Sequence, residues 1–116
     1  KNSILFDHVQ VPHFNYVGDS ILGYKSHLGA GAITSNVKSD KGTVAVRLAD
    51  GAAIDTKLRK FGAMVGDFAE IGCNAVLSPG TMIGRCSVVY PLTMARGVIP
   101  SDHILKNNGV LVKKNQ

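Results

Sequence analysis

One short segment, residues 12–19, gathers polar side chains of the kinds that carry out acid–base chemistry. It reads Pro-His-Phe-Asn-Tyr-Val-Gly-Asp, so His13 and Tyr16 stand three residues apart. An exposed imidazole can accept a proton near neutral pH, as a general base must. A tyrosine hydroxyl can donate a hydrogen bond to an anionic oxygen. The residue types alone leave a second interpretation open, in which His13 is an ordinary surface or packing residue.

The elements that must position this segment are hexapeptide repeats. From residue 65 to residue 100 an aliphatic residue or alanine opens every group of six: Val65, Ile71, Leu77, Ile83, Val89 and Ala95. Neither a helix nor a single strand holds a period of six, whereas a parallel β-helix does. The sequence therefore predicts an all-β fold with one short strand and one turn per hexad. The fifth residue of the hexads is small in five of six, with Ile99 in the last one, and the small residue is expected to fit a narrow interior. The glycines in second place are expected to supply positive φ in the turns.

Three hexads make one triangular coil, so residues 18 apart should lie above one another: Met64 and Met82, Ile71 and Val89, Leu77 and Ala95. Residues 1–33 form a first hexad block with one step of five residues at Ser20–Ile21. Residues 34–64 are an insertion, in which two alternating runs flank Asp50-Gly51 and predict a β-hairpin. Residues 65–100 form the second block. Residues 101–116 are expected to leave the repeat after Pro100 as a tail, with a last strand near residues 110–112. The whole chain is expected to form one β-helix domain of about four coils.

Composition narrows the possible partners. The chain has 116 residues, 45% hydrophobic, with a net charge of +5, which suits anionic ligands. No aromatic RNA-binding motif is present and the four histidines share no phase of the repeat, so neither a nucleic-acid partner nor a metal site is expected. The two cysteines are too few for a disulfide framework, and there is no signal peptide or long apolar run. We therefore expect a cytoplasmic protein without membrane contact. The chain starts at Lys1 and not at methionine, which suggests a fragment.

The segment His13-Phe-Asn-Tyr-Val-Gly-Asp19, followed by Leu28-Gly-Ala-Gly-Ala-Ile-Thr-Ser-Asn36, resembles a known family. It is similar to the acetyltransferase domain of the bifunctional N-acetylglucosamine-1-phosphate uridyltransferase and glucosamine-1-phosphate acetyltransferase, and to related sugar-1-phosphate nucleotidyltransferases that carry a similar β-helix. The resemblance implies a left-handed β-helix, the C-terminal part of a longer nucleotidyltransferase. It also implies a homotrimer with active sites between subunits, acetyl-CoA as the acyl donor and an amino-sugar 1-phosphate, glucosamine 1-phosphate foremost, as the acceptor.

The same resemblance implies roles for individual residues. His13 corresponds to the general base that deprotonates the sugar amine, and Asn36 to an asparagine that contacts the substrate at the catalytic centre. Tyr16 and Lys1, which lies twelve residues before His13, correspond to residues that hold the sugar phosphate. These expectations agree with elementary chemistry, because an alkyl-ammonium must lose a proton before it can attack a thioester and a phosphate requires fixed donors.

The resemblance also implies roles at positions where this sequence matches the family pattern less closely. Ala30 and Cys73 correspond to positions that line the acetyl-CoA groove, where main-chain groups are expected to bind. His27 stands where the family has a substrate-contacting asparagine, so it either replaces that donor or indicates another sugar. Lys38 and Lys41 resemble lysines that contact substrate in the nucleotidyltransferase relatives, and a solvated hairpin base is the equally weighted alternative.

Two functions remain open from the sequence. The first is acetyl-CoA-dependent N-acetylation of an amino-sugar 1-phosphate in nucleotide-sugar synthesis. The second is a non-catalytic, trimerising β-helix domain of a sugar-1-phosphate nucleotidyltransferase. The combination of His13, Tyr16, Asn36 and Lys1 favours the first function, whereas His27 favours the second.

Overall fold

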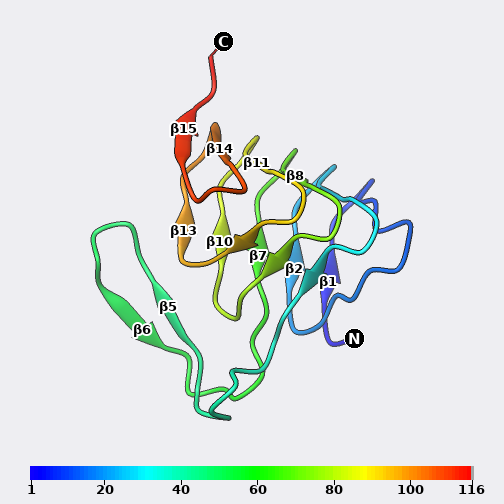
Figure 1. The fold of residues 1–116 in the computed structure, drawn as a ribbon. Coiled ribbons are helices and arrows are strands. Elements are labelled where there is room, and N and C mark those ends of the chain that lie inside the picture. The colour runs from blue at the N-terminus through cyan, green and yellow to red at the C-terminus, as the bar shows by residue number, and fades with distance from the viewer. Residues whose placement is uncertain (116) are drawn as a thin grey trace.

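The computed structural model describes residues 1–115, and every regular element among them is a strand (Figure 1). The strands are β1 Ile4–Leu5, β2 Ile21–Leu22, β3 His27–Leu28, β4 Ile33–Thr34, β5 Ala45–Arg47, β6 Ala53–Asp55, β7 Met64–Val65, β8 Glu70–Ile71, β9 Val76–Leu77, β10 Met82–Ile83, β11 Val88–Val89, β12 Met94–Ala95, β13 Val98–Ile99, β14 His103–Leu105 and β15 Leu111–Lys113. Within these residues there is no helical segment with the length and hydropathy of a membrane span.

Parallel pairing arranges most strands into three sheets that form the sides of a β-helix. Sheet A has the order β1-β2-β7-β10-β13, sheet B the order β3-β8-β11-β14, and sheet C the order β4-β9-β12. The predicted stacking is confirmed at all three pairs: Met82 pairs with Met64, Val89 with Ile71, and Ala95 with Leu77. The hexad period is therefore the period of the sides, because each hexad contributes one strand and one corner.

The interior of the coils is filled by the first and fifth residues of the hexads. Leu28, Leu77 and Val89 are completely buried at first positions. The fifth positions hold small buried side chains, namely Ala69, Ala75, Thr81, Ser87 and Thr93. The hydroxyls among them are satisfied by nearby carbonyls; Thr81 Oγ1, for example, donates to Ser78 O at 2.6 Å. Burying a hydroxyl without such a partner costs free energy. Ser26, the fifth residue of the hexad that begins at Leu22, is an exception, since its buried Oγ has no partner among the described residues.

The glycines in the second position of the hexads do not have the expected positive φ. Positive φ falls instead on the fourth residue of the hexads, which is usually not glycine: Phe68, Asn74, Cys86 and Leu92 have φ of 58–60°. At Gly66, an added Cβ would lie 2.8 Å from the main-chain nitrogen of Arg85 in the next coil. The expectation of positive φ was therefore wrong. These glycines are needed because the main chain of the neighbouring coil passes too close for a side chain.

The three corners of the coil differ in regularity. The corner between sheets A and B and the corner between sheets B and C keep the step of six residues in every coil, for example from Ile71 to Leu77. The corner between sheets C and A, called the C/A corner below, contains the step of five that ends at Leu22. It also contains the whole insertion between β4 and β7.

A third change of register at the C/A corner shows that the last hexad was assigned wrongly from the sequence. Ile99 was expected in fifth place, but it pairs with Ile83 and so opens a new side only four residues after Ala95. The stacking then continues beyond Pro100, since β14 pairs in parallel with β11. The expectation that the repeat ends at Pro100 was wrong. The chain leaves the repeat only at residues 106–110, where it turns back, and β15 pairs antiparallel with β14.

The insertion contains β5 and β6, which pair antiparallel with Val46 opposite Ile54 and a turn at Asp50-Gly51. At its base Val37 forms an antiparallel bridge with Lys60. Figure 1 shows this pair of strands standing away from the coils. Val44 and Val46 are buried, so the first strand is anchored although its tip projects.

Candidate active site

A hydrogen-bonded cluster of three side chains occupies the C/A corner of the first two coils. Asn36 Nδ2 donates to Tyr16 OH at 3.1 Å and to Asp19 Oδ2 at 2.7 Å. A Cβ at Gly18 would overlap the Tyr16 ring, so this glycine gives the ring its place. Because the Tyr16 oxygen accepts from Asn36, its own hydrogen stays available for a ligand. The structure thus brings the side chains of Tyr16 and Asn36 together.

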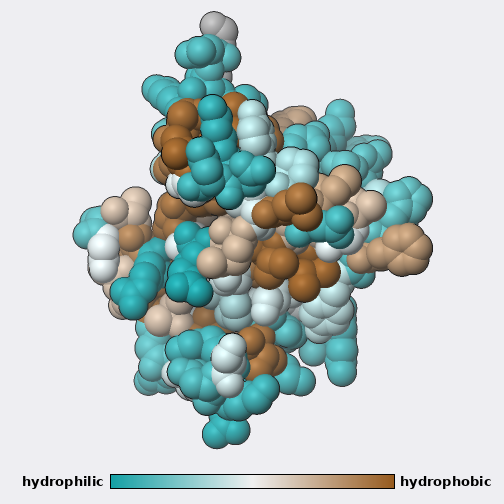
Figure 2. Space-filling view, viewed as in Figure 1, coloured by the Kyte–Doolittle hydropathy of each residue, from teal (hydrophilic) through white to brown (hydrophobic). Residues whose placement is uncertain are grey.

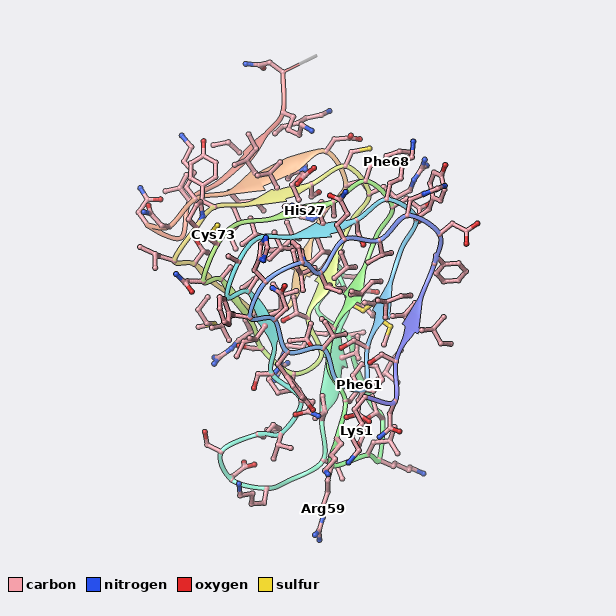
Figure 3. The ribbon with its side chains drawn as sticks, turned by 90° about the vertical axis from the view of Figure 1, so that its right-hand side faces the viewer. Lys1, His27, Arg59, Phe61, Phe68 and Cys73 are labelled. Carbon is pink, nitrogen blue, oxygen red and sulfur yellow. The ribbon has the colours of Figure 1, made fainter. Side chains whose placement is uncertain are left out.

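The main chain of Lys1 lies against the same cluster. Asp19 N donates to Lys1 O at 3.0 Å, and Gly62 N donates to Asp19 O at 2.8 Å. Phe61 N donates to Asn36 O at 3.0 Å, which fixes the returning end of the insertion to the cluster. Figure 3 shows Lys1 and Phe61 at one end of the molecule, with Arg59 beyond them. The main chain of Lys1 is therefore tied to the turn that carries Asp19.

The base of the insertion adds further charge next to this cluster. Lys38 Nζ lies 3.7 Å from Asp40 Oδ2, and Asp40 Oδ1 accepts from Gly42 N at 2.8 Å. The hydrogen bond from Gly42, followed by the charge of Lys38, lowers the pKa of the Asp40 carboxyl. Lys41 is exposed. The bridge between Val37 and Lys60 also brings Arg59 and Lys60 to this base, which the sequence analysis did not single out.

His13 lies at a different place, on the corner between sheets B and C, called the B/C corner below. Its turn is fastened by Asn15, whose Oδ1 accepts from His13 N at 3.0 Å and whose Nδ2 donates to Gly29 O at 2.8 Å and Ala32 O at 2.9 Å. Within residues 1–115 the imidazole of His13 has no hydrogen-bond partner. The main chain is thus held firmly while the ring is free to meet a ligand.

Ala30 and Cys73 follow His13 in a column along the B/C corner. Gly31 N donates to His13 O, Asn74 N to Ala30 O and Leu92 N to Cys73 O, at 2.9–3.0 Å. The N–H groups of Ala30 and Cys73 themselves have no acceptor among the described residues. Two unpaired main-chain donors with small side chains therefore lie in line beyond His13.

His27 is separated from both groups, because it lies on the outer surface of sheet B. Its Nδ1 lies 3.1 Å from Glu70 Oε2, and the two residues pair directly across β3 and β8. They line a pocket of about 440 Å³ together with His8, Gln10 and Lys25. Figure 3 shows His27 and Cys73 far from Lys1 along the molecule. Within one chain, His27 does not join Tyr16 and Asn36.

Two further residues of the site belong to the polar segment 12–19, and the sequence predicted no role for them. Asn15 fastens the His13 turn, and Asp19 accepts from Asn36. The available signal was their position beside His13 and Tyr16 in a segment richer in polar residues than a regular hexad. Their partners lie 14–17 residues away, so the pairing appears only when the coils stack.

The arrangement of short parallel strands in three sheets defines the class of the protein, a hexapeptide-repeat β-helix. No protein-family model matches the chain. The fold is shared with a variant of the N-acyltransferase AntD from Bacillus cereus in complex with dTDP and coenzyme A, with a TM-score of 0.58 and 14% identity. That comparison covers 100% of this chain and 80% of the AntD chain.

In sequence, the chain is related to bifunctional sugar-1-phosphate enzymes. It is 37% identical over 117 residues to the bifunctional protein GlmU of a Methanococcus maripaludis strain, covering 100% of this chain and 28% of that protein. It is 34% identical over 91 residues to the bifunctional sugar-1-phosphate nucleotidylyltransferase/acetyltransferase of Sulfurisphaera tokodaii, covering 78% of this chain and 22% of that protein. The chain thus spans 22–28% of the length of these relatives.

Proposed function

We propose that this chain forms an acetyl-CoA-dependent N-acetyltransferase site for an amino-sugar 1-phosphate, with glucosamine 1-phosphate as the first candidate acceptor. The observation that carries the proposal is the turn of His13. Asn15 holds the main chain of this turn, the imidazole is unpaired within the described residues, and three residues later Tyr16 presents a hydroxyl hydrogen that Asn36 leaves free. The name of the Sulfurisphaera tokodaii relative, a sugar-1-phosphate nucleotidylyltransferase/acetyltransferase, supports the same chemistry.

In this proposal His13 acts as the general base. It removes a proton from the amine of the sugar as the nitrogen attacks the thioester carbonyl, the C–N bond forms, and the C–S bond breaks. The proton then passes from His13 to the departing sulfur, so that coenzyme A leaves as a thiol. A positioned base of this kind contributes about two to four orders of magnitude in rate, and holding the two reactants together contributes further.

The acyl donor would lie along the B/C corner. The unpaired N–H groups of Ala30 and Cys73 are suited to the amide carbonyls of an extended pantetheine chain, and neither side chain is large enough to cover them. The coenzyme A complex of the AntD variant, which shares the fold, supports an acyl-CoA as donor. The acetyltransferase activity in the name of the Sulfurisphaera tokodaii relative supports acetyl as the acyl group.

The sugar phosphate would be held at the C/A corner by Tyr16 and Lys1, with Lys38 and Lys41 from the base of the insertion. Asn36 would orient Tyr16 and contact the substrate. Because His27 lies on sheet B, it would reach this substrate only from a second copy of the chain. We therefore propose a homotrimer whose active sites are shared between subunits, a state also favoured by the exposed apolar side chains of Ile4, Ile54 and Leu58.

The test is release of thiol from acetyl-CoA in the presence of glucosamine 1-phosphate or galactosamine 1-phosphate. His13→Ala should lower turnover by about two to four orders of magnitude while leaving assembly and thermal unfolding unchanged. His8→Ala is the control, because His8 is also an exposed turn histidine but lies at the corner between sheets A and B, with its ring against Tyr24. Absence of turnover with either sugar, from a folded oligomer, would favour the non-catalytic domain. Loss of assembly in His13→Ala would make His13 a packing residue.

A further inference from the structure

A groove of about 500 Å³ separates the insertion from the coils. Its walls come from four segments: residues 35–40 after β4, residues 44–47 in and before β5, residues 78–80 after β9, and residues 96–97 after β12. The segments after β4, β9 and β12 all belong to the C/A corner. The groove therefore lies on the same corner as the Tyr16–Asn36–Asp19 cluster, but further along the stack. Its lining residues do not include that cluster, His13 or the Ala30–Cys73 column.

The charged side chains of the groove are unbalanced toward the positive sign. Lys38, Arg47 and Arg96 line it, whereas Asp40 is its one carboxylate and lies 3.7 Å from Lys38. Arg47 and Arg96 make no ion pair with any other described residue. In Figure 2 hydrophilic side chains lie between the insertion and the coils. Two unpaired guanidinium groups on opposite walls are an arrangement that suits an anion with several oxygens.

The fold holds the two walls close together. A Cβ at Gly80 would lie 2.7 Å from Ala45 O, so the turn after β9 touches the first strand of the insertion. Val44 is 1% exposed and anchors that strand. Val44, Ala45 and Arg47 line the groove, and the exposed Ala45 and Arg47 alternate with the buried Val44 and Val46 along the strand. Arg47 is thus carried by an anchored strand and not by the projecting tip.

We propose that this groove binds the phosphoryl groups of a small anionic ligand, with Lys38, Arg47 and Arg96 as the contacts. Arginine side chains bind phosphoryl oxygens through two parallel N–H groups, and Ser35, Ser39 and Ser78 add hydroxyl donors on the same walls. The phosphoryl group has two possible sources, the sugar 1-phosphate or the phosphates of coenzyme A. The proposal rests on the proposed function only for this choice of ligands.

The test is calorimetric titration of the full chain. Pyrophosphate is the reference ligand, and glucosamine 1-phosphate, glucosamine and coenzyme A are titrated next. Arg96→Gln and Arg47→Gln should each weaken pyrophosphate binding by about tenfold or more, the usual size of one charge-assisted contact. Arg85→Gln is the matched control, since Arg85 is an exposed arginine after β10 at a different corner. Asp40→Asn should act in the opposite direction and tighten binding several-fold, because it removes the opposing charge and keeps an oxygen for Gly42 N.

The ligand that supplies the phosphoryl group is the one whose affinity falls in Arg96→Gln and Arg47→Gln by the same factor as the affinity for pyrophosphate. The affinity for glucosamine, which has no phosphate, should not change. Equal pyrophosphate affinity in wild type, Arg96→Gln and Arg85→Gln would overturn the proposal even if acetyl transfer is found. Conversely, the expected losses would uphold it even if acetyl transfer fails, since pyrophosphate binding needs no turnover. A change of oligomeric state in Arg96→Gln without a change in pyrophosphate affinity would make the groove a contact between copies and would also overturn the proposal.

Discussion

The B/C corner and the C/A corner are made from the same repeat, yet they differ in regularity. At the B/C corner the step is six residues in each coil, from Leu28 to Thr34 and from Ile71 to Leu77. At the C/A corner the chain takes a step of five before Leu22, a step of four before Ile99, and the insertion between β4 and β7. Side chains that bond to one another, such as Tyr16, Asp19 and Asn36, gather at the C/A corner.

The difference shows how a repeat fold divides its work. A strict step places equivalent main-chain groups in a straight column, which suits an extended ligand such as a pantetheine chain. A varied step destroys that column but allows side chains from successive coils to lean toward one another. The proposed general base His13 and the proposed phosphate-binding residues would then meet across one side of the coil, each carried by a different corner.

The largest effect that would test this comparison concerns stability. At the B/C corner, a Cβ on Gly72 would lie 2.7 Å from Tyr90 C and 2.8 Å from Pro91 Cδ in the next coil. At the C/A corner, Gly97 has φ of 74° and open space around its Cβ position. Gly72→Ala should therefore cost about 3 kcal/mol of unfolding free energy through overpacking, and Gly97→Ala only about 1 kcal/mol through its left-handed backbone. Urea unfolding of both variants measures this difference.

Equal losses in the two variants would mean that coil spacing at the B/C corner adjusts freely, which would remove the physical basis of a fixed main-chain column. A Gly97→Ala variant that unfolds more readily than Gly72→Ala would reverse the comparison altogether.

The second test compares two asparagines. Asn15 at the B/C corner bonds to main-chain groups, whereas Asn36 at the C/A corner donates to the side chains of Tyr16 and Asp19. Asn15→Ala should cost about 2 kcal/mol of unfolding free energy, because it leaves Ala32 O and His13 N without a partner. Asn36→Ala should cost less than about 1 kcal/mol and should lower kcat/KM for the sugar phosphate by about tenfold.

Thermal or urea unfolding and steady-state kinetics on both variants separate the two roles. If Asn36→Ala unfolds as readily as Asn15→Ala, its hydrogen bonds serve the fold more than the ligand. If Asn15→Ala retains full stability, the turn of His13 is held by something other than this amide.

The smallest expected effect concerns Asp40. Its pKa is lowered from the ordinary value of 3.8, first by the hydrogen bond from Gly42 and then by Lys38. A lowered pKa contributes stability that is present above the ordinary value and is lost as pH falls through the folded value. The difference in unfolding midpoint between wild type and Asp40→Asn should thus shrink as the pH is lowered from about 6 to below about 4. A difference that grows on acidification would contradict this sign.

Much of the stacking could be predicted from the sequence because burial alone determines it. Ile71 lies beside Val89 and Leu77 beside Ala95, as their spacing of three hexads requires. The last coil was misjudged at Ile99, because a step of four residues leaves aliphatic residues at several acceptable positions. The role of the second-place glycines was misjudged for another reason. Gly66 is demanded by the distance to Arg85 in the next coil, and no local pattern contains that distance.

Less of the candidate site could be predicted. The residue types at His13 and Tyr16 indicated acid–base chemistry, but the hydrogen bond from Asn36 to Asp19 depends on how much the shortened step moves one coil over another. The pairing of His27 with Glu70 crosses 43 residues, including the whole insertion. The groove with Arg47 and Arg96 likewise exists only because an anchored strand returns to the coils. None of these contacts follows from local spacing.

The reversal of direction at β15 has a consequence for how copies of this chain can add to one another. A stack of parallel coils has unpaired strand edges at its terminal coils, so in principle a second copy could pair there and continue the stack. On sheet B that edge is occupied by β15, which runs antiparallel and carries Lys113, followed by Lys114, whose Nζ donates to Cys86 O at 2.8 Å. The C-terminal hairpin thus covers the edge of sheet B with a strand of opposite direction.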